Sequence, residues 1–144
     1  MIEEQYVDFD TARLLKVKGF RAKCNRYYNA QYGMIRTVSD TFMMDFNDQE
    51  HMKSIGMEGA VNIPTQQMAM RWLREEHNID ISIEPHSHSG IKTVEYEFTY
   101  WYEGYYHAPY QEKTPNYHPL FGKTYNTYEQ ACDAAIKYCL ENLI

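Results

Sequence analysis

Two stretches in the middle of the chain alternate apolar and polar residues: Ile79-Asp80-Ile81-Ser82-Ile83-Glu84, then Val94-Glu95-Tyr96-Glu97-Phe98-Thr99-Tyr100-Trp101-Tyr102-Glu103. A period of two is typical of a β-strand with one face buried and the other in water. Residues 85–90, which begin with a proline and end with a glycine, favour a turn between the stretches. The sequence therefore predicts two antiparallel strands whose apolar rows share one buried face.

Three helices are predicted from their boundary residues. Residues 8–20 begin with acids, end with bases, and place Gly19 where a left-handed residue usually ends a helix. Leu15 and Phe20 would then make the hydrophobic contact of a Schellman motif. Thr65 is the expected cap of a second helix, and Thr127 begins a capping box for a third. The apolar stripe of the third helix consists of Tyr128, Cys132, Ala135, Ile136, Cys139 and Leu143.

The remaining segments have weaker patterns. Residues 27–46 predict two or three short strands, whereas residues 47–63 lack a regular period and predict a loop or an internal seam. Residues 104–126 predict a loop rich in Tyr, Pro and His, with a short strand at 121–125 as an option. Together the patterns predict a single α+β domain over residues 1–144. They predict an antiparallel sheet with three helices packed on one face, and the order α-β-β-(β)-α in the C-terminal half.

The composition is that of a soluble globular protein. The chain has 144 residues, 44% hydrophobic and 24% charged, with a formal net charge of −6. It has no run of about 18 apolar residues, and its first residues are acidic rather than basic. Three cysteines without a C-x-x-C pair predict reduced thiols. Lys23 and Arg26 could activate Cys24, but a buried, inert thiol is favoured. We expect a cytoplasmic protein without membrane spans.

Tyrosine is unusually frequent. The chain has 14 Tyr against 6 Phe and 2 Trp, and aromatic residues make up 15% of it. Tyr rings on a proline-stiffened loop lose little entropy on binding. The expected partner-binding residues are therefore Tyr105, Tyr106, Tyr110 and Tyr117. The alternative is that these rings fold back and cover the sheet.

Residues 13–26 are the sharpest electrostatic feature. They contain six bases and no acid, so this stretch carries +6 and the rest of the chain −12. Basic residues beside aromatic rings, here Tyr27 and Tyr28, suit phosphate contact and base stacking. The alternative is a solvated helix face. If the stretch binds nucleic acid, the contacts come from Arg13, Lys16, Lys18, Arg21, Lys23 and Arg26.

Motifs for catalysis or metal binding are weak. His86 and His88 flank Ser87 in the expected turn, where a shared face is not guaranteed, so solvated histidines are favoured over a metal site. Glu95, Glu97 and Glu103 share one expected strand face, which favours the wet side of a sheet over a catalytic carboxylate group. The chain has no G-x-S-x-G, P-loop or dinucleotide motif. We expect no catalytic residue, no cofactor and no bound metal.

Three segments resemble a group of short uncharacterised proteins encoded in prophages and mobile elements of gut anaerobes: residues 9–20 (FDTARLLKVKGF), 64–79 (PTQQMAMRWLREEHNI) and 128–140 (YEQACDAAIKYCL). The resemblance implies an accessory role in a mobile element and no catalytic residues. From residue 65 onward the order of elements is also similar to the double-stranded-RNA-binding domain. That family contacts phosphates through lysines at the start of its last helix. Because this chain has Thr127, Tyr128, Glu129 and Gln130 there, this resemblance implies the topology and not RNA binding.

These expectations favour a noncatalytic protein-interaction module that engages a host or phage protein through the Tyr-rich loop. The alternative is a nucleic-acid-binding accessory protein that uses residues 13–26, and an enzyme ranks third. Exposed strand edges and the charge asymmetry also suit self-association, which leaves a homo-oligomer open.

Overall fold

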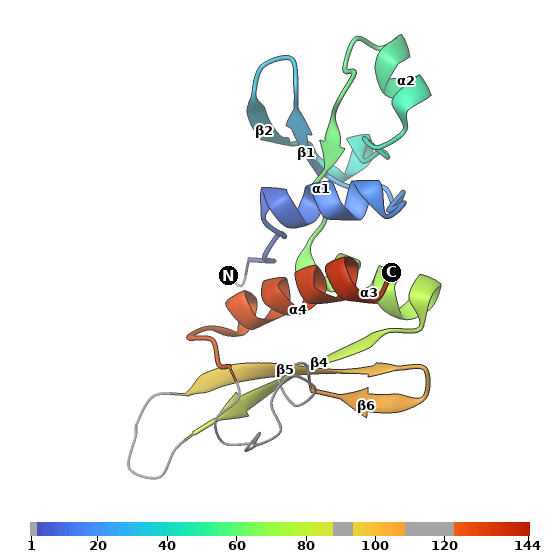
Figure 1. The fold of residues 1–144 in the computed structure, drawn as a ribbon. Coiled ribbons are helices and arrows are strands. Elements are labelled where there is room, and N and C mark those ends of the chain that lie inside the picture. Colours follow the sequence, from blue (N-terminus) through green and yellow to red (C-terminus); the bar gives the residue numbers. More distant parts are fainter. Residues whose placement is uncertain (1–2, 88–93, 109–122) are drawn as a thin grey trace. The chain divides into compact units, whose positions relative to one another are not determined.

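The structure is a computed structural model, and it describes residues 3–87, 94–108 and 123–144 (Figure 1). The predicted α+β class is confirmed. Contacts divide the chain into two compact units, Met1–Ala69 with Ile144, and Met70–Leu143. The strands form two three-stranded antiparallel sheets, where the sequence predicts one sheet with three helices on one face. The single domain over residues 1–144 stays a prediction.

The first unit contains the sheet β2-β1-β3, formed by β1 (Arg26–Asn29), β2 (Met34–Thr37) and β3 (Val61–Asn62). Both edges of β1 are used, because β2 pairs with one edge and β3 with the other. The short strands expected in residues 27–46 therefore form a sheet of their own and do not extend the sheet of the alternating stretches. The ring of Tyr27, on β1, stacks on Phe46 at a centroid distance of 4.1 Å.

Helix α1 (Phe9–Val17) begins and ends as the sequence predicts. Asp8 caps its first turn by accepting the Thr11 N–H at 2.7 Å. At the other end Gly19 has φ +94°, and the Phe20 N–H donates to the Leu15 carbonyl at 2.9 Å. This arrangement is the expected Schellman motif. Leu15 and Phe20 are fully buried and anchor α1, which packs against β3 in the first unit.

Residues 47–63 contain regular structure, so the expected loop is wrong. The 3-10 helix η1 (Asp40–Phe42) precedes this segment, and helix α2 (Gln49–Ser54) lies within it. Asp48 caps α2 by accepting the His51 N–H, and Met52 is the one buried residue of the helix. A helix of this length with one buried side chain has too little periodicity for recognition from sequence.

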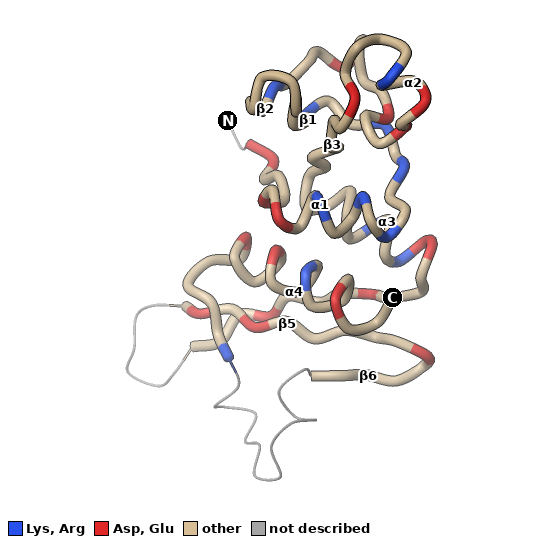
Figure 2. Tube along the Cα trace, turned by 45° about the horizontal axis from the view of Figure 1, so that its top comes forward, with Lys and Arg blue, Asp and Glu red and all other residues tan. Residues whose placement is uncertain are grey.

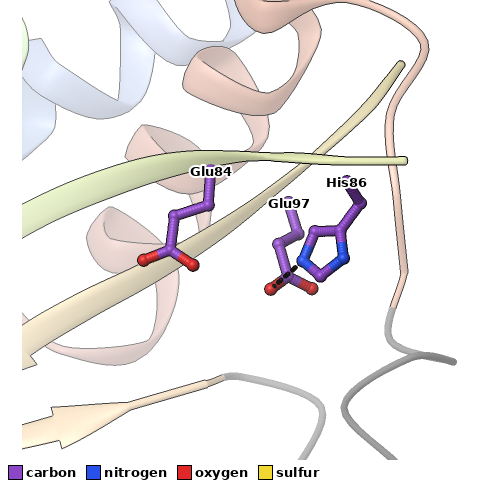
Figure 3. Close-up of side chains that lie close together, drawn as sticks. All are labelled: Glu84, His86 and Glu97. Atoms are coloured by element: carbon purple, nitrogen blue, oxygen red, sulfur yellow. Dashed lines mark ion pairs between the residues drawn. The ribbon is translucent and has the colours of Figure 1, made fainter. Parts of the chain in front are cut away.

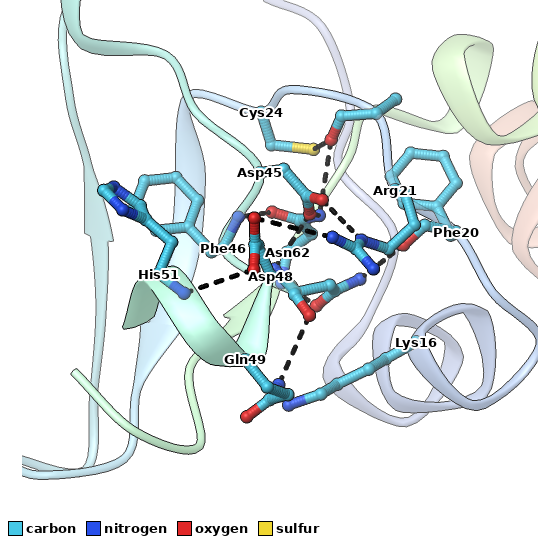
Figure 4. A network of polar contacts seen from close by, with 12 residues as sticks. Lys16, Phe20, Arg21, Cys24, Asp45, Phe46, Asp48, Gln49, His51 and Asn62 are labelled. Carbon is cyan, nitrogen blue, oxygen red and sulfur yellow. Dashed lines mark hydrogen bonds and ion pairs between the residues drawn. The ribbon is translucent and has the colours of Figure 1, made fainter. Parts of the chain in front are cut away.

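Two buried asparagines hold residues 45–62 in place (Figure 4). Asn62 Oδ1 accepts the Phe46 N–H at 2.7 Å. Its Nδ2 donates to Asp45 Oδ1 at 2.8 Å and to the Ala22 carbonyl at 3.3 Å. Asn47 Oδ1 in turn accepts the Asn62 N–H at 2.9 Å. These amides satisfy backbone groups that no helix or sheet pairs, which gives an irregular segment a defined path.

The second unit contains the sheet β4-β5-β6 and the last helix: β4 (Asp80–His86), β5 (Glu95–Tyr102), β6 (Tyr105–His107) and α4 (Tyr128–Asn142). β5 pairs antiparallel with both neighbours, as the alternating pattern predicts for β4 and β5. Helix α4 lies across one face of this sheet (Figure 1). There the Tyr138 ring lies 5.8 Å from Phe98 and 5.7 Å from Tyr100. Thr127 caps α4 by accepting the Gln130 N–H, as expected.

Helix α3 (Gln66–His77) precedes β4 and completes the predicted order α-β-β-(β)-α. Thr65 caps it by accepting the Met68 N–H at 3.2 Å, and Asn78, with φ +55°, ends it in a left-handed conformation. In the three described ranges, none of the helices combines the length and the apolar character that crossing a bilayer requires.

Strand β4 runs further than the sequence predicts, through Pro85 and His86. Proline is tolerated because β4 is an edge strand. Tyr96, opposite Pro85, makes its backbone hydrogen bonds with Tyr125 on the other side of β5, at 2.8 and 2.7 Å. His86 therefore lies on a strand and not in the expected turn. Of the optional strand at residues 121–125, the described residues show one β-bridge, between Tyr125 and Tyr96. Residues 121–122 lie outside the described part.

A tight hairpin joins β5 to β6. Glu103 has φ +52° and Gly104 has φ +80°, between the paired residues Tyr102 and Tyr105. Positive φ at both loop positions defines a type I′ turn, whose twist matches that of the strands. Tyr105 and Tyr106 consequently lie on a strand and not in the expected loop.

Candidate functional site

One face of the β4-β5-β6 sheet is turned away from α4. Side chains alternate along a strand, so residues opposite one another in the register share a face. We call this face the polar face; it consists of Asp80, Ser82, Glu84, His86, Glu95, Glu97, Thr99, Trp101 and Tyr106. Acidic residues and a histidine lie at one end of it, and aromatic residues lie at the other.

Three side chains meet at the acidic end, Glu84 and His86 from β4 and Glu97 from β5 (Figure 3). We call them the acid–histidine cluster. Glu84 lies directly opposite Glu97 in the register. His86 Nε2 lies 2.5 Å from Glu97 Oε1, and these side chains are 23% and 15% exposed. One nitrogen or oxygen atom of each of the three residues lies within 4.8 Å of the others. An imidazole nitrogen and two carboxylate oxygens are groups that bind divalent metal ions.

The strands around the cluster are rich in acidic residues. β4, β5 and β6 contain four acidic residues and neither Lys nor Arg, and Figure 2 shows acidic positions along β5. Glu95 accepts a hydrogen bond from Thr124 Oγ1 at 2.8 Å. Like charges directly opposite each other destabilise a sheet. The pairing of Glu84 with Glu97 is therefore opposed by a repulsion, and His86 is the residue of these strands whose side chain contacts Glu97.

Thr99 lies on the polar face between its two ends. The residue is 2% exposed, and its Oγ1 has no hydrogen-bond partner within the described ranges. Most buried side-chain hydroxyls in native structures have a partner. Thr99 is thus an exception on the same strand face as Glu97, two residues along β5.

Two exposed rings, Trp101 and Tyr106, mark the aromatic end, and Tyr105 follows beside them. Trp101 is 51%, Tyr106 49% and Tyr105 72% exposed. Trp101 and Tyr106 pair across β5 and β6, with ring centroids 5.6 Å apart at an interplanar angle of 65°. Tyr105 follows the turn and belongs to the opposite face by alternation. The other two expected partner-binding residues, Tyr110 and Tyr117, lie outside the described residues.

The basic residues of segment 13–26 lie in the first unit, and two of them are held in specific contacts. Arg21 forms an ion pair with Asp45 at 2.5 Å and a longer one with Asp48 at 3.7 Å. The hydrogen bond that Arg21 donates to Asp45 raises the pKa of Arg21. Lys16 Nζ donates to the Ala60 carbonyl at 2.8 Å, and partial burial lowers the pKa of Lys16. These two side chains have structural partners that a phosphate would have to displace.

The other four basic side chains differ in the contacts that they make. Arg26 lies over the Tyr6 ring at 3.6 Å, and Lys18 Nζ donates to a backbone carbonyl at 2.6 Å. Arg13 lies 5.9 Å from a phenylalanine ring. Lys23 is exposed and makes no hydrogen bond or ion pair with the part of the chain that the structure describes. Figure 2 shows basic positions along α1, but most of these charges already have contacts within their own unit.

All three cysteines are buried, free thiols. Burial raises the pKa of Cys24 and of Cys139 to about 12, and that of Cys132 to about 11. Thiols of this kind are neutral at physiological pH, and only the thiolate is a nucleophile or a good metal ligand. The expected burial of Cys24 is confirmed, and burial and the nearby Asp45 both raise its pKa.

Sequence reasoning missed the acid–histidine cluster because it placed its members in different elements. It weighed His86 with His88, which lies outside the described residues, and assigned both to a turn. The available signal was the period of two, which continues from Glu84 to His86 if Pro85 is allowed on an edge strand. The register that places Glu97 opposite Glu84 has no signal in the sequence, because eight residues separate β4 from β5 and no two-residue turn fixes the pairing.

Comparison with protein-family models, with curated proteins and with solved structures finds no match to this chain. Its function is therefore argued from the geometry of its own residues.

Proposed function

We propose that this protein is a noncatalytic protein-binding module whose recognition surface is the aromatic end of the polar face together with Tyr105. The observation that carries the proposal is the exposure of Trp101, Tyr105 and Tyr106 on one short hairpin. Buried Trp and Tyr side chains supply much of the binding energy at protein interfaces. The accessory role in a prophage or mobile element, which the sequence resemblance implies, would make the partner a host or phage protein.

The hairpin supports this role because it presents the rings in a preorganised form. The turn at Glu103 and Gly104 sets the register of the two strands, and the Trp101 ring packs edge-on against Tyr106. A preorganised surface loses less conformational freedom on binding than a flexible loop does. This rigidity, and not a proline-stiffened loop, is what suits these aromatic residues to recognition.

Acidic residues beside the rings suggest the chemistry of the partner. Asp80 lies opposite Trp101 in the register, and Glu103 lies in the turn. Arginine and lysine side chains both stack on aromatic faces and pair with carboxylates. The net charge of −6 also attracts basic surfaces at long range. We therefore propose a partner whose contact surface combines basic and apolar side chains.

A pull-down from host lysate tests the proposal. The full chain is immobilised and exposed to lysate with and without nuclease, at two salt concentrations, and bound proteins are identified by mass spectrometry. Trp101→Ala and Tyr106→Ala are the test variants, and Tyr32→Ala, at another exposed tyrosine, is the matched control. We expect a nuclease-resistant partner that binds the wild type and the control variant but is lost by both test variants.

Equal capture by all four proteins would refute the assignment of the surface, and an empty pull-down would count against the module itself. Recovery that disappears with nuclease, and also with Lys23→Glu, would support the nucleic-acid alternative instead. Lys23 suits this test because it is exposed and makes no hydrogen bond or ion pair with the described residues, whereas reversing Arg21 would also break its pairs with Asp45 and Asp48.

A further inference from the structure

The geometry points to a second property of the sheet: the acid–histidine cluster of Glu84, His86 and Glu97 is a binding site for a divalent transition-metal ion of the Zn²⁺ class. This site is independent of the protein-binding surface proposed above. One imidazole nitrogen and two carboxylate oxygens form a mixed set that first-row transition ions accept, whereas Mg²⁺ and Ca²⁺ prefer oxygen ligands alone.

The ligand atoms are close enough to share one ion. Bonds from zinc to nitrogen or oxygen are about 2.0 to 2.2 Å long, so two ligands at tetrahedral angles lie about 3.4 Å apart. The three atoms lie within 4.8 Å of one another, and His86 already contacts Glu97 at 2.5 Å. Closing the widest separation takes a movement of about 1.4 Å or less, which a small adjustment of glutamate χ angles supplies.

The charge balance at this end of the sheet also favours a cation. Glu84 faces Glu97 across β4 and β5, and Glu95 faces His86 in the next pair. None of the three strands contributes a Lys or Arg. A divalent ion bound between Glu84 and Glu97 would offset the repulsion between these two facing carboxylates.

Thr99 gives a second, independent indication. It shares the strand face of Glu97, and its buried hydroxyl has no partner within the described ranges. Three protein ligands leave a fourth position of a zinc ion open to water. Thr99 follows Glu97 by two positions on β5, so the one buried hydroxyl without a partner in the described ranges lies on the strand face that carries the cluster. The three ligands come from two paired strands, which hold them more precisely than loops do.

Calorimetric titration of the chelator-treated full chain with zinc chloride tests the site. We expect one zinc ion per chain, with binding at least tenfold weaker in His86→Ala, Glu84→Gln and Glu97→Gln. His51→Ala and Glu50→Gln are matched controls, because they change the same residue types at exposed positions of α2. Both controls should bind zinc as the wild type does.

Thermal melting separates loss of the site from loss of the fold. Glu84 makes no ion pair within the described residues, and it faces Glu97 directly. Glu84→Gln therefore removes a repulsion, and its metal-free form should melt at or above the temperature of the wild type. Zinc should raise the melting temperature of the wild type and the controls but not that of Glu84→Gln, because an ion stabilises only a fold that binds it.

Three outcomes would overturn the assignment. The first is unchanged zinc affinity in Glu84→Gln or Glu97→Gln together with loss in His88→Ala, which would place the metal on the His86-Ser87-His88 segment. The second is binding of Mg²⁺ or Ca²⁺ that His86→Ala leaves unaffected. The third is a Co²⁺ complex with sulfur-to-metal charge-transfer absorption, because the three cysteines are buried and contribute no ligand to this site.

Discussion

Replacing Asn62 with alanine should be among the most destabilising single changes in the first unit. The side chain is fully buried and makes three hydrogen bonds. Its Oδ1 accepts the Phe46 N–H at 2.7 Å, and its Nδ2 donates to Asp45 Oδ1 at 2.8 Å and to the Ala22 carbonyl at 3.3 Å. Alanine removes all three bonds, because its methyl group neither donates nor accepts a hydrogen bond.

The magnitude follows from what is left unpaired. A buried polar group without a partner costs about 1 to 3 kcal/mol, and the Phe46 N–H is left in that state. The Ala22 carbonyl keeps only the weak Cys24 thiol donor, at 3.5 Å. Asp45 loses less, because it keeps its ion pair with Arg21. We expect Asn62→Ala to lower the free energy of unfolding by about 3 to 5 kcal/mol. That is a large part of the 5 to 15 kcal/mol, roughly, that stabilises a typical domain.

Urea denaturation followed by far-UV circular dichroism measures this change. With a slope of about 2 kcal/mol/M, the midpoint should fall by about 2 M. Gln49→Ala is the control, because Gln49 is exposed and its Nε2 makes only a 3.4 Å bond to the Asn47 carbonyl; its midpoint should hardly move. An Asn62→Ala midpoint equal to that of the control would refute the reasoning.

The same experiment tests the predicted single domain. Both tryptophans, Trp72 and Trp101, belong to the second unit, so their fluorescence follows residues 70–143. Asn62 belongs to the first unit. If residues 1–144 unfold as one cooperative domain, Asn62→Ala shifts the fluorescence transition and the circular dichroism transition together. A fluorescence transition that stays in place while the other moves would contradict the prediction.

Two further substitutions and one labelling experiment have expected outcomes. Glu103→Asn should raise the free energy of unfolding by about 0.5 to 1 kcal/mol in urea titrations, because asparagine adopts the φ of +52° at lower cost than glutamate; a decrease would contradict this. Thr99→Val should stabilise the metal-free protein by about 1 kcal/mol by removing an unpaired hydroxyl, whereas a loss would show that the hydroxyl has a partner. Burial raises the pKa of Cys24 and Cys139 to about 12 and that of Cys132 to about 11. Iodoacetamide at pH 8 should therefore modify these thiols only after unfolding. Rapid modification of the native chain, detected by mass spectrometry, would contradict this.

The features that were predictable from sequence are those encoded by near neighbours. The Schellman motif of Leu15, Gly19 and Phe20 needs only a glycine at the right distance from two apolar residues, and it is confirmed. The caps at Thr65 and Thr127 depend on residues three positions away, and both are present. The period of two in the alternating stretches placed β4 and β5 because each strand buries one face.

The features that were not predictable depend on distant partners. Whether strands form one sheet or two depends on which edges pair, and both edges of β1 pair within the first unit. Pro85 normally argues against a strand, and only the edge position of β4 permits it. The cluster needs that extension to place His86 and the register to place Glu97 opposite Glu84. A candidate site built across two strands is therefore visible only once their pairing is known.

The two proposals on the polar face can fail independently, because its ends are far apart. A strand rises about 3.4 Å per residue, so Glu97 and Trp101, four positions apart on β5, are separated by about 14 Å along it. That distance exceeds the screening length of about 8 Å at physiological salt. A charge change at Glu97, whether by mutation or by a bound ion, therefore has little effect on an exposed partner at Trp101. At low salt the screening weakens, and a bound cation would then reduce the attraction for a basic partner. We expect Glu97→Gln to lose zinc binding and still capture the partner. We expect Trp101→Ala to lose the partner and still bind zinc. These two results together would separate the two sites.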